Sequence, residues 1–196
     1  RQRQMCIRDR KEVADVINTV PLEDQKFYLQ WNLIDAAASF LSDDFVAQNF
    51  DFYSRTMSGK KEMQPRWKRA VSTVDGSLGE VVGQMYVEKY FPAAAKERMV
   101  GLVKNLQTSL GERIKALEWM SEPTKVKALE KLATSHVKIG YPDKWKDYSA
   151  LEIKDDSYWA NIERANEWDY NEMIAKAGKP VDKDEWLMTP QTVNAY

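Results

Sequence analysis

Hydrophobic residues recur every three or four positions along one long central stretch of the chain. They are Met99, Val103, Leu106, Leu110, Ile114 and Leu117. This spacing places an apolar stripe on one face of a helix with about 3.6 residues per turn, whereas a half-buried strand would alternate apolar and polar residues. The opposite face is polar or charged. We therefore predict an amphipathic helix that begins near Ala93 and packs on one side.

A second helix is predicted directly after the first. Ser121 is a suitable N-cap, and Pro123 falls in the first turn, where a missing N–H costs nothing. The apolar stripe of this helix is Val126, Leu129, Leu132 and Ala133. After His136 the helical spacing stops and a Gly-Tyr-Pro sequence follows, which is typical of a turn. The pattern predicts a short extended segment near 137–141.

Helical spacing also covers most of the remaining chain. Helices are predicted over 11–19, from Pro21 to Leu41, from Ser42 to Gly59, from Pro65 to Val74 with an interruption near Asp75-Gly76, from Leu78 to Pro92, and over about 155–176. The aromatic residues of these helices are expected in the core. The last stretch, 188–196, is rich in Thr, Val and Tyr and suits a strand. The predicted fold class is mainly α, a multi-helix domain with one extended segment and a C-terminal strand.

Three glycines, Gly79, Gly83 and Gly101, fall at helical positions. Each costs about 1 kcal/mol relative to alanine in a helix interior. They do not form a phosphate-binding loop, because no strand precedes them and no Gly-Lys-Ser follows. We predict that they permit close approach between helices.

Composition narrows the functional classes. The chain has 196 residues, 43% hydrophobic and 30% charged, with a net charge of −1. A nucleic-acid-binding surface needs clustered Lys and Arg on one face, so nucleic acid is not an expected partner. A local basic cluster, composed of Lys60, Lys61, Arg66, Lys68 and Arg69, is interpreted as a solvated helix face. No apolar run approaches the ~20 residues of a membrane span.

The first ten residues lack periodicity and resemble translated adapter sequence, so residues 1–10 are excluded from fold reasoning. A polybasic surface arm is the alternative interpretation. Cys6, within this stretch, is the single cysteine, so the chain is expected to form no intrachain disulfide.

No catalytic constellation is visible in the residues. A zinc peptidase of the H-E-x-x-H type needs two histidines one helical turn apart, and His136 is the single histidine. We interpret His136 as a residue near a helix C-terminus, where the helix dipole favours its protonated form. Asp155 and Asp156 could bind a cation. The simpler interpretation is that their negative charges stabilise the N-terminus of a helix through its dipole. We therefore assign no catalytic residue and no metal ligand.

Four blocks of sequence, in order, resemble the neprilysin and endothelin-converting-enzyme family of zinc metalloendopeptidases. They are Arg66-Trp67-Lys68-Arg69, Val82 to Glu88, Trp119 to Asp143 with its Trp-Met-Ser and Ile-Gly-Tyr-Pro-Asp sequences, and Val181 to Trp186 leading to Val193-Asn194-Ala195-Tyr196. The resemblance extends from about residue 12 to the end. Animal members carry a cysteine where this chain has Ala70, which suggests a disulfide-free, bacterial version.

The resemblance implies a fragment that ends before the zinc-binding helix. Residues 11–180 would be part of the helical N-terminal domain, and residues 181–196 the start of a catalytic-domain strand. Zinc would be bound by the full-length protein and not by this fragment. The matching Asn and Ala of the family bind the substrate peptide, so the resemblance implies substrate binding by Asn194 and Ala195. From the residues alone, an Asn near a strand end is usually a turn-former.

The expected function is therefore cleavage of oligopeptides before hydrophobic residues by the full-length enzyme, with the fragment itself inactive. The expected partners are an oligopeptide substrate and the C-terminal catalytic domain of the same chain. The sequence does not fix the compartment: bacterial members of the family occur in the cell envelope and in the cytoplasm, and the resemblance favours the envelope or periplasm. The alternative, from another class, is a non-catalytic helical module that binds a peptide in an aromatic-rich groove.

Overall fold

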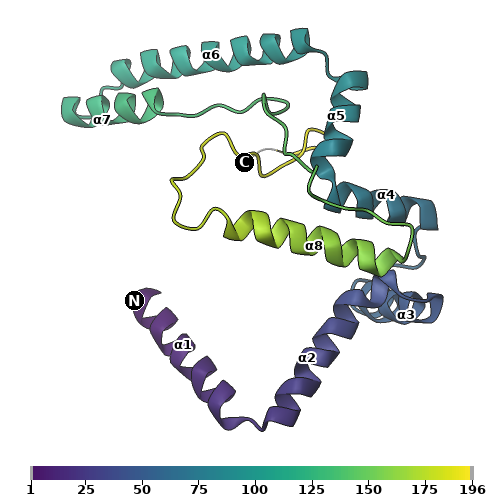
Figure 1. Cartoon of the computed structure of the whole chain (residues 1–196). Helices are drawn as coiled ribbons and strands as arrows, with labels where there is room; N and C mark the ends of the chain where they lie inside the picture. Colours follow the sequence, from purple (N-terminus) through teal and green to yellow (C-terminus); the bar gives the residue numbers. More distant parts are fainter. Residues whose placement is uncertain (1, 195–196) are drawn as a thin grey trace. The chain divides into compact units, whose positions relative to one another are not determined.

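The structure is a computed structural model that describes residues 2–194 and the side chains of residues 8–194 (Figure 1). It is mainly helical, which confirms the predicted fold class at that level. The side chain of Cys6, and residues Ala195 and Tyr196, lie outside the described residues. None of the described helices is both long and apolar enough to cross a membrane.

The helices follow one another with short connections as far as residue 133, and α8 follows after a longer non-helical stretch. In chain order they are α1 (Gln2–Thr19), α2 (Leu22–Ala37), the 3-10 helix η1 (Ala38–Phe40), α3 (Asp43–Asn49), the π-helix η2 (Phe50–Thr56), α4 (Arg66–Ser77), α5 (Gly79–Tyr90), α6 (Ala93–Ala116), α7 (Glu122–Ala133) and α8 (Tyr158–Ile174).

Most predicted helices are confirmed, with two corrections of detail. Ser121 is the N-cap of α7 with Pro123 in the first turn, but its hydroxyl lies 2.8 Å from that of Thr124 and makes no capping bond to a backbone N–H. The interruption predicted near Asp75-Gly76 is present but lies two residues later, at Leu78, because α4 continues to Ser77 and α5 begins at Gly79. A single exposed glycine costs a helix too little to break it when the flanking turns are intact.

The described residues contain no strand. Residues 135–139 and 192–194 have no regular secondary structure, so neither the extended segment near 137–141 nor the C-terminal strand is confirmed as a strand. A strand is defined by hydrogen bonds to a neighbouring strand, and no described residue supplies one. The turn at Gly140 is confirmed, since Gly140 has a φ of 75° and the Tyr141 N–H donates to the Ile139 carbonyl at 2.9 Å.

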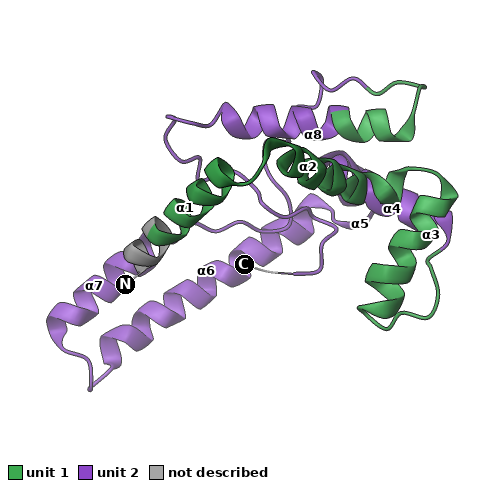
Figure 2. Ribbon diagram, turned by 90° about the horizontal axis from the view of Figure 1, so that it is seen from below, with its two compact units in different colours: residues 1–64, 153–163 green, residues 65–152, 164–196 purple. Residues whose placement is uncertain are grey.

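The chain divides into two compact units (Figure 2). Unit 1 comprises the residues up to 64 together with 153–163, and unit 2 comprises residues 65–152 and those from 164 onward. In unit 1 the buried apolar residues are Ala37, Ala38 and Ile162. The ring of Phe40 packs edge-on against Tyr158 at 5.4 Å between centroids. This contact joins η1 to the start of α8 within unit 1.

Unit 2 contains α4 to α7 and the C-terminal part of α8. Helices α6 and α7 lie side by side, where Ile114 is buried and a Cβ at Gly111 would be 3.5 Å from Leu132 (Figure 1). At the other end of α6, Lys96 Nζ donates to the Tyr141 carbonyl at 2.8 Å and pairs with Asp143 at 2.6 Å. This lysine therefore attaches the 140–143 turn to the first turn of α6.

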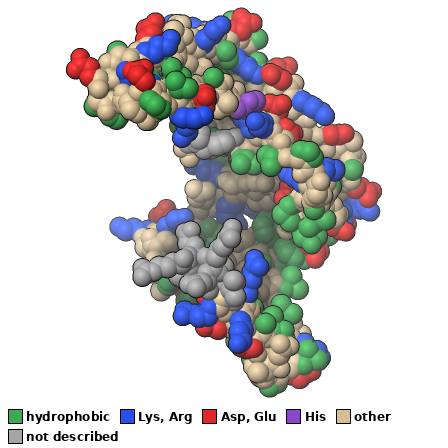
Figure 3. All heavy atoms as spheres, turned by 90° about the vertical axis from the view of Figure 1, so that its left-hand side faces the viewer, with side chains coloured by type: hydrophobic (Ala, Val, Ile, Leu, Met, Phe, Trp, Pro, Cys, Tyr) green, Lys and Arg blue, Asp and Glu red, His purple; other side chains and the backbone are tan. Residues whose placement is uncertain are grey.

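Large apolar side chains are exposed over much of the described chain. On α2, Phe27 is 68% and Trp31 65% exposed, so the prediction of core positions for these aromatics is wrong for the described chain. Hydrophobic side chains also lie at the surface among charged ones on the face drawn in Figure 3. Full burial of such a side chain stabilises a fold by about 1.5–3 kcal/mol, and the exposed residues do not contribute this stabilisation. Apolar surface on this scale is typical of a face that another segment covers.

We expect purified residues 11–196 to form a loose state. The chain should bind a hydrophobic dye strongly and show no sharp thermal transition, because few large side chains are buried to make unfolding cooperative. Dye fluorescence and calorimetry measure both properties. The control is the protein encoded by the complete reading frame that contains these residues, called the full reading-frame protein. A sharp transition of residues 11–196 without dye binding would contradict this expectation.

Candidate functional site

The C-terminal segment, residues 188–194, is seated on two glycines of α5. A Cβ at Gly79 would lie 2.7 Å from Thr189 Cγ2, and a Cβ at Gly83 would lie 2.9 Å from Pro190 Cδ. Real Cβ atoms essentially never approach so closely, so the segment fits because both positions are glycine. The close approach predicted for Gly79 and Gly83 is thus present, but the element that approaches α5 is the C-terminal segment and not another helix. For Gly101 the prediction is wrong, because nothing lies within 4 Å of its Cβ position.

Gln191 attaches the same segment through its side-chain amide. Its Nε2 donates to Asp75 Oδ1 at 2.5 Å and to the Gly79 carbonyl at 3.0 Å. The segment turns at this point, because the Thr192 N–H donates to the Thr189 carbonyl at 3.0 Å. Both hydrogens of the Gln191 amide are thus used. Gln191 is half-buried, so loss of its amide would leave the Asp75 carboxylate and the Gly79 carbonyl without this donor. We call Asp75, Gly79, Gly83 and Gln191 the anchor.

Asn194 comes three residues after Gln191. Its backbone N–H donates to the Thr192 carbonyl at 3.0 Å, and the residue is exposed. The structure therefore places Asn194 at the surface, directly after an attached turn, while Ala195 lies outside the described residues. Substrate binding by these two residues stays a prediction.

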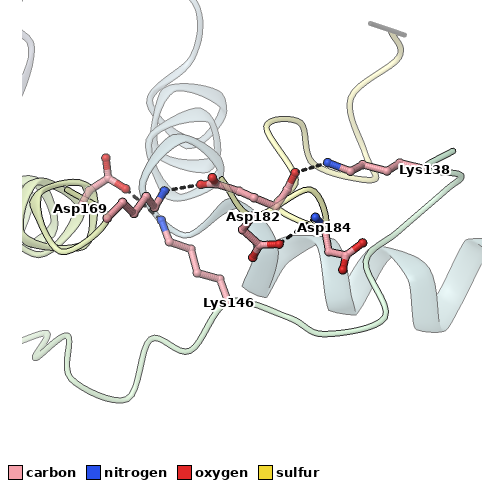
Figure 4. A network of polar contacts seen from close by, with 7 residues as sticks. Lys138, Lys146, Asp169, Asp182 and Asp184 are labelled. Atoms are coloured by element: carbon pink, nitrogen blue, oxygen red, sulfur yellow. Dashed lines mark hydrogen bonds and ion pairs between the residues drawn. The ribbon is translucent and has the colours of Figure 1, made fainter. Parts of the chain in front are cut away.

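Residues 178–187, which we call the strap, connect α8 to the anchored segment and carry several polar contacts (Figure 4). Lys138 Nζ donates to the Glu185 carbonyl at 2.5 Å, and the Glu185 carboxylate pairs with Lys176. The hydrogen bond that Lys176 Nζ donates to the Glu185 carboxylate raises the pKa of Lys176, because it favours the charged form of the lysine. The Asp184 N–H donates to Asp182 Oδ1 at 2.8 Å.

His136 also contacts the strap. Its Nε2 lies 2.9 Å from Asp184 Oδ1, and α7 ends three residues earlier at Ala133. His136 thus lies near the C-terminus of a helix, as interpreted from the sequence, and it also has a side-chain partner 48 positions away along the sequence. The Asp184 side chain is 85% exposed. Exposed pairs of this kind contribute about 0–1 kcal/mol each, so the strap is held weakly.

An aromatic–lysine cluster joins α8 to α5 within unit 2. Tyr148 stacks on Trp168 with centroids 4.6 Å apart, and Lys146 Nζ lies 4.6 Å from the Trp168 ring centre. Lys146 also pairs with Asp169 at 2.9 Å, and its backbone N–H donates to Glu80 Oε2 at 2.6 Å. Burial raises the pKa of the Tyr148 hydroxyl, because the phenolate would lose hydration there.

These elements surround a cavity of about 1360 Å³ within unit 2. The strap, the 136–150 segment, the start of α5 and the end of α8 line it, with lysines and carboxylates interspersed. Among the described residues, no group of three or more His, Cys, Asp and Glu could hold a metal ion. The contacts described above attach the C-terminal segment to the rest of unit 2.

The sequence interpretation missed Asp75 and Gln191 as residues of this region. One signal was available, since Thr-Pro favours a turn and proline interrupts a strand. That signal argues for a turn at Thr189-Pro190 before any strand could begin. No signal in the sequence pairs Gln191 with Asp75, because 116 positions separate them.

Comparisons with known proteins agree on one family. The model of the N-terminal region of peptidase family M13 matches residues 10–142. Human endothelin-converting enzyme 1 is 30% identical over 196 residues, covering 95% of this chain and 25% of the relative. A neutral endopeptidase from Lactobacillus helveticus is 33% identical over 183 residues, covering 92% of this chain and 28% of the relative. The chain thus spans about a quarter of the length of these relatives.

Two solved structures of the Mycobacterium tuberculosis zinc metalloprotease Zmp1 are similar in fold and sequence. The inhibitor complex is 43% identical with a TM-score of 0.86, covering 94% of this chain and 28% of that one. The open state is 44% identical with a TM-score of 0.83, covering 94% and 29%. The family model alone covers more than half of the sequence. From these matches, the chain belongs to peptidase family M13.

Proposed function

We propose that this chain is the helical part of a zinc metalloendopeptidase that cleaves oligopeptides before hydrophobic residues. The observation that carries the proposal is the similarity to Zmp1, described as a zinc metalloprotease, at 43% identity over 94% of this chain. Residues 11–180 form the helical portion, and residues 181–196 begin the catalytic portion. Zinc and its ligands belong to a part of the enzyme beyond these residues.

In this proposal Asn194 and Ala195 bind the substrate main chain. An Asn amide offers a donor and an acceptor, and an extended peptide can add to a strand edge through main-chain hydrogen bonds. Within the predicted strand 188–196, the residues after the anchored turn form that strand when a neighbouring strand is present, and the segment near 137–141 is extended in the same state. The exposure of Asn194 and its position after the anchored turn support this role.

The catalytic portion of the same protein is the partner that covers the exposed apolar faces, and oligopeptides are the substrates. The near balance of charge, with 29 Lys and Arg against 30 Asp and Glu, supports a protein that does not bind nucleic acid. A bacterial cell-envelope location belongs to the proposal as well.

The test is to sequence downstream of codon 196 and assay the full reading-frame protein on a quenched peptide. We expect an H-E-x-x-H motif followed by E-x-x-x-D, and hydrolysis that a chelator abolishes and added zinc restores. A stop codon at that point, with peptide binding by residues 11–196, would instead support the helical binding module. Zinc-dependent hydrolysis by residues 11–196 alone would overturn the assignment of the zinc site to a part beyond these residues.

A further inference from the structure

We infer that the anchor (Asp75, Gly79, Gly83 and Gln191) sets the position of the substrate-binding residue Asn194, which makes Gln191 a positioning residue for peptide hydrolysis. This inference rests on the proposed function. It concerns residues that would not touch the substrate, and it assigns a role to a side chain that lies outside the proposed binding pair.

The first support is the hydrogen-bond pattern of Gln191. One amide group connects the end of α4, through Asp75 Oδ1 at 2.5 Å, with the first residue of α5, through the Gly79 carbonyl at 3.0 Å. The bond to a carboxylate is charge-assisted and therefore stronger than a neutral one. Gln191 thus fixes the C-terminal segment relative to two helices simultaneously.

The second support is steric. Gly79 and Gly83 lie four positions apart, hence on the same face of α5, and Thr189 and Pro190 occupy the space that side chains there would need. Proline adds rigidity at this contact, because its ring fixes φ. The segment therefore has one seat on α5, defined both by shape and by hydrogen bonds.

The third support is the short distance along the chain to Asn194. After Gln191, the side chain of Val193 is fully exposed, and the backbone bonds of Thr192 and Asn194 are local to the turn. Within the described residues, the anchor is the last attachment to a helix before Asn194. An Asn194 side chain displaced from its contact would lose hydrogen bonds to the substrate main chain, so the anchor controls the affinity for the peptide.

The decisive substitution is Gln191→Glu in the full reading-frame protein. It is nearly isosteric, but it replaces two donors by a carboxylate that faces Asp75 and the Gly79 carbonyl. We expect KM for the peptide to rise about tenfold with little change in kcat, because an interaction made equally in the ground state and the transition state is weakened. Amide exchange at Thr192 and Asn194 should accelerate in the same variant.

Two comparisons separate positioning from a general loss of stability. Asp75→Asn keeps an acceptor for Gln191 and should retain most of the affinity, and Asp75→Asn combined with Gln191→Glu should recover part of the lost affinity through a reversed hydrogen bond. Gly83→Ala should raise KM, whereas Gly101→Ala, with nothing within 4 Å of its Cβ position, should leave KM unchanged.

The inference is overturned if Gln191→Glu and Gly83→Ala leave KM and the exchange of the two amides at wild-type values. It is also overturned if these variants lower only kcat, because a smaller folded fraction does that without displacing Asn194. If the wild-type protein hydrolyses no peptide, the proposed function fails. Amide exchange in the same variants then still shows whether the anchor holds the segment.

Discussion

Replacing Gly140 by alanine is expected to destabilise unit 2 by about 2–4 kcal/mol. Gly140 has a φ of 75°, which costs an L-residue about 1 kcal/mol. An added Cβ would also lie 3.1 Å from Phe91 Cζ, and nearer still to Phe91 Cε1. Overpacking of this kind costs about 1–3 kcal/mol. Amide exchange at Tyr141 and Phe91 measures the effect, and we expect it to accelerate roughly a hundredfold.

Gly178→Ala is the matched control for this experiment. Gly178 has a φ of 76°, but nothing lies within 4 Å of its Cβ position, so it reports backbone strain alone. We expect only about a fivefold acceleration of exchange near residue 178, which corresponds to about 1 kcal/mol. Adding Phe91→Ala to Gly140→Ala should cost less than the sum of the single changes, because the clash is then removed. Equal effects of Gly140→Ala and Gly178→Ala would show that the Phe91 contact is unimportant.

Removal of the Trp168 side chain is expected to release the 145–150 segment from α8. Trp168 supports Tyr148 by stacking and Lys146 by a cation–π contact, and about 2–3 kcal/mol should be lost when this half-buried ring becomes alanine. Exchange of the Lys146 amide, which donates to Glu80, measures the loss. Trp168→Phe keeps a stacking ring and should cost less than half as much.

The titration of Tyr148 gives an independent measurement in the same variant. Burial raises the pKa of the Tyr148 hydroxyl in the folded chain above its value in the unfolded chain. The stabilisation that comes from keeping this hydroxyl protonated is therefore complete below the ordinary tyrosine pKa and is lost as the pH rises through the raised value. Trp168→Ala should lower this pKa toward its ordinary value, as seen in phenolate absorbance. An unchanged titration would show that Trp168 does not bury the hydroxyl.

The helices were predictable from sequence because their apolar spacing is a local property. The stripe of α6 and the Ser-x-Pro start of α7 need no knowledge of distant residues, and both helices form where they were predicted. Core positions were less predictable. Within the apolar stripe of α6, Ile114 is buried whereas Leu106 is 61% exposed, because α7 covers only part of the stripe.

The candidate site depended on contacts that no local pattern contains. Gly79 and Gly83 were singled out for close approach, but their partners lie more than 100 positions away in a segment interpreted as a strand. Strand formation itself depends on a neighbouring strand, which propensity alone cannot provide. The contact between His136 and Asp184 was unpredictable for the same reason, since 48 positions separate the two residues.

The C-terminal segment is attached to α5 more firmly than the strap is attached to its neighbours, and this difference has a consequence for proteolysis. Lys183 in the strap is exposed, so a trypsin-like protease can reach the peptide bond that follows it, whereas the bond after Lys179 resists such a protease because Pro180 follows it. The residues that hold the C-terminal segment on α5, Thr189 to Gln191, come after this bond, and their partners in α4 and α5 come before it. A molecule nicked there would keep its last residues docked without any covalent link to α8, and denaturing electrophoresis would reveal two pieces where gel filtration finds one.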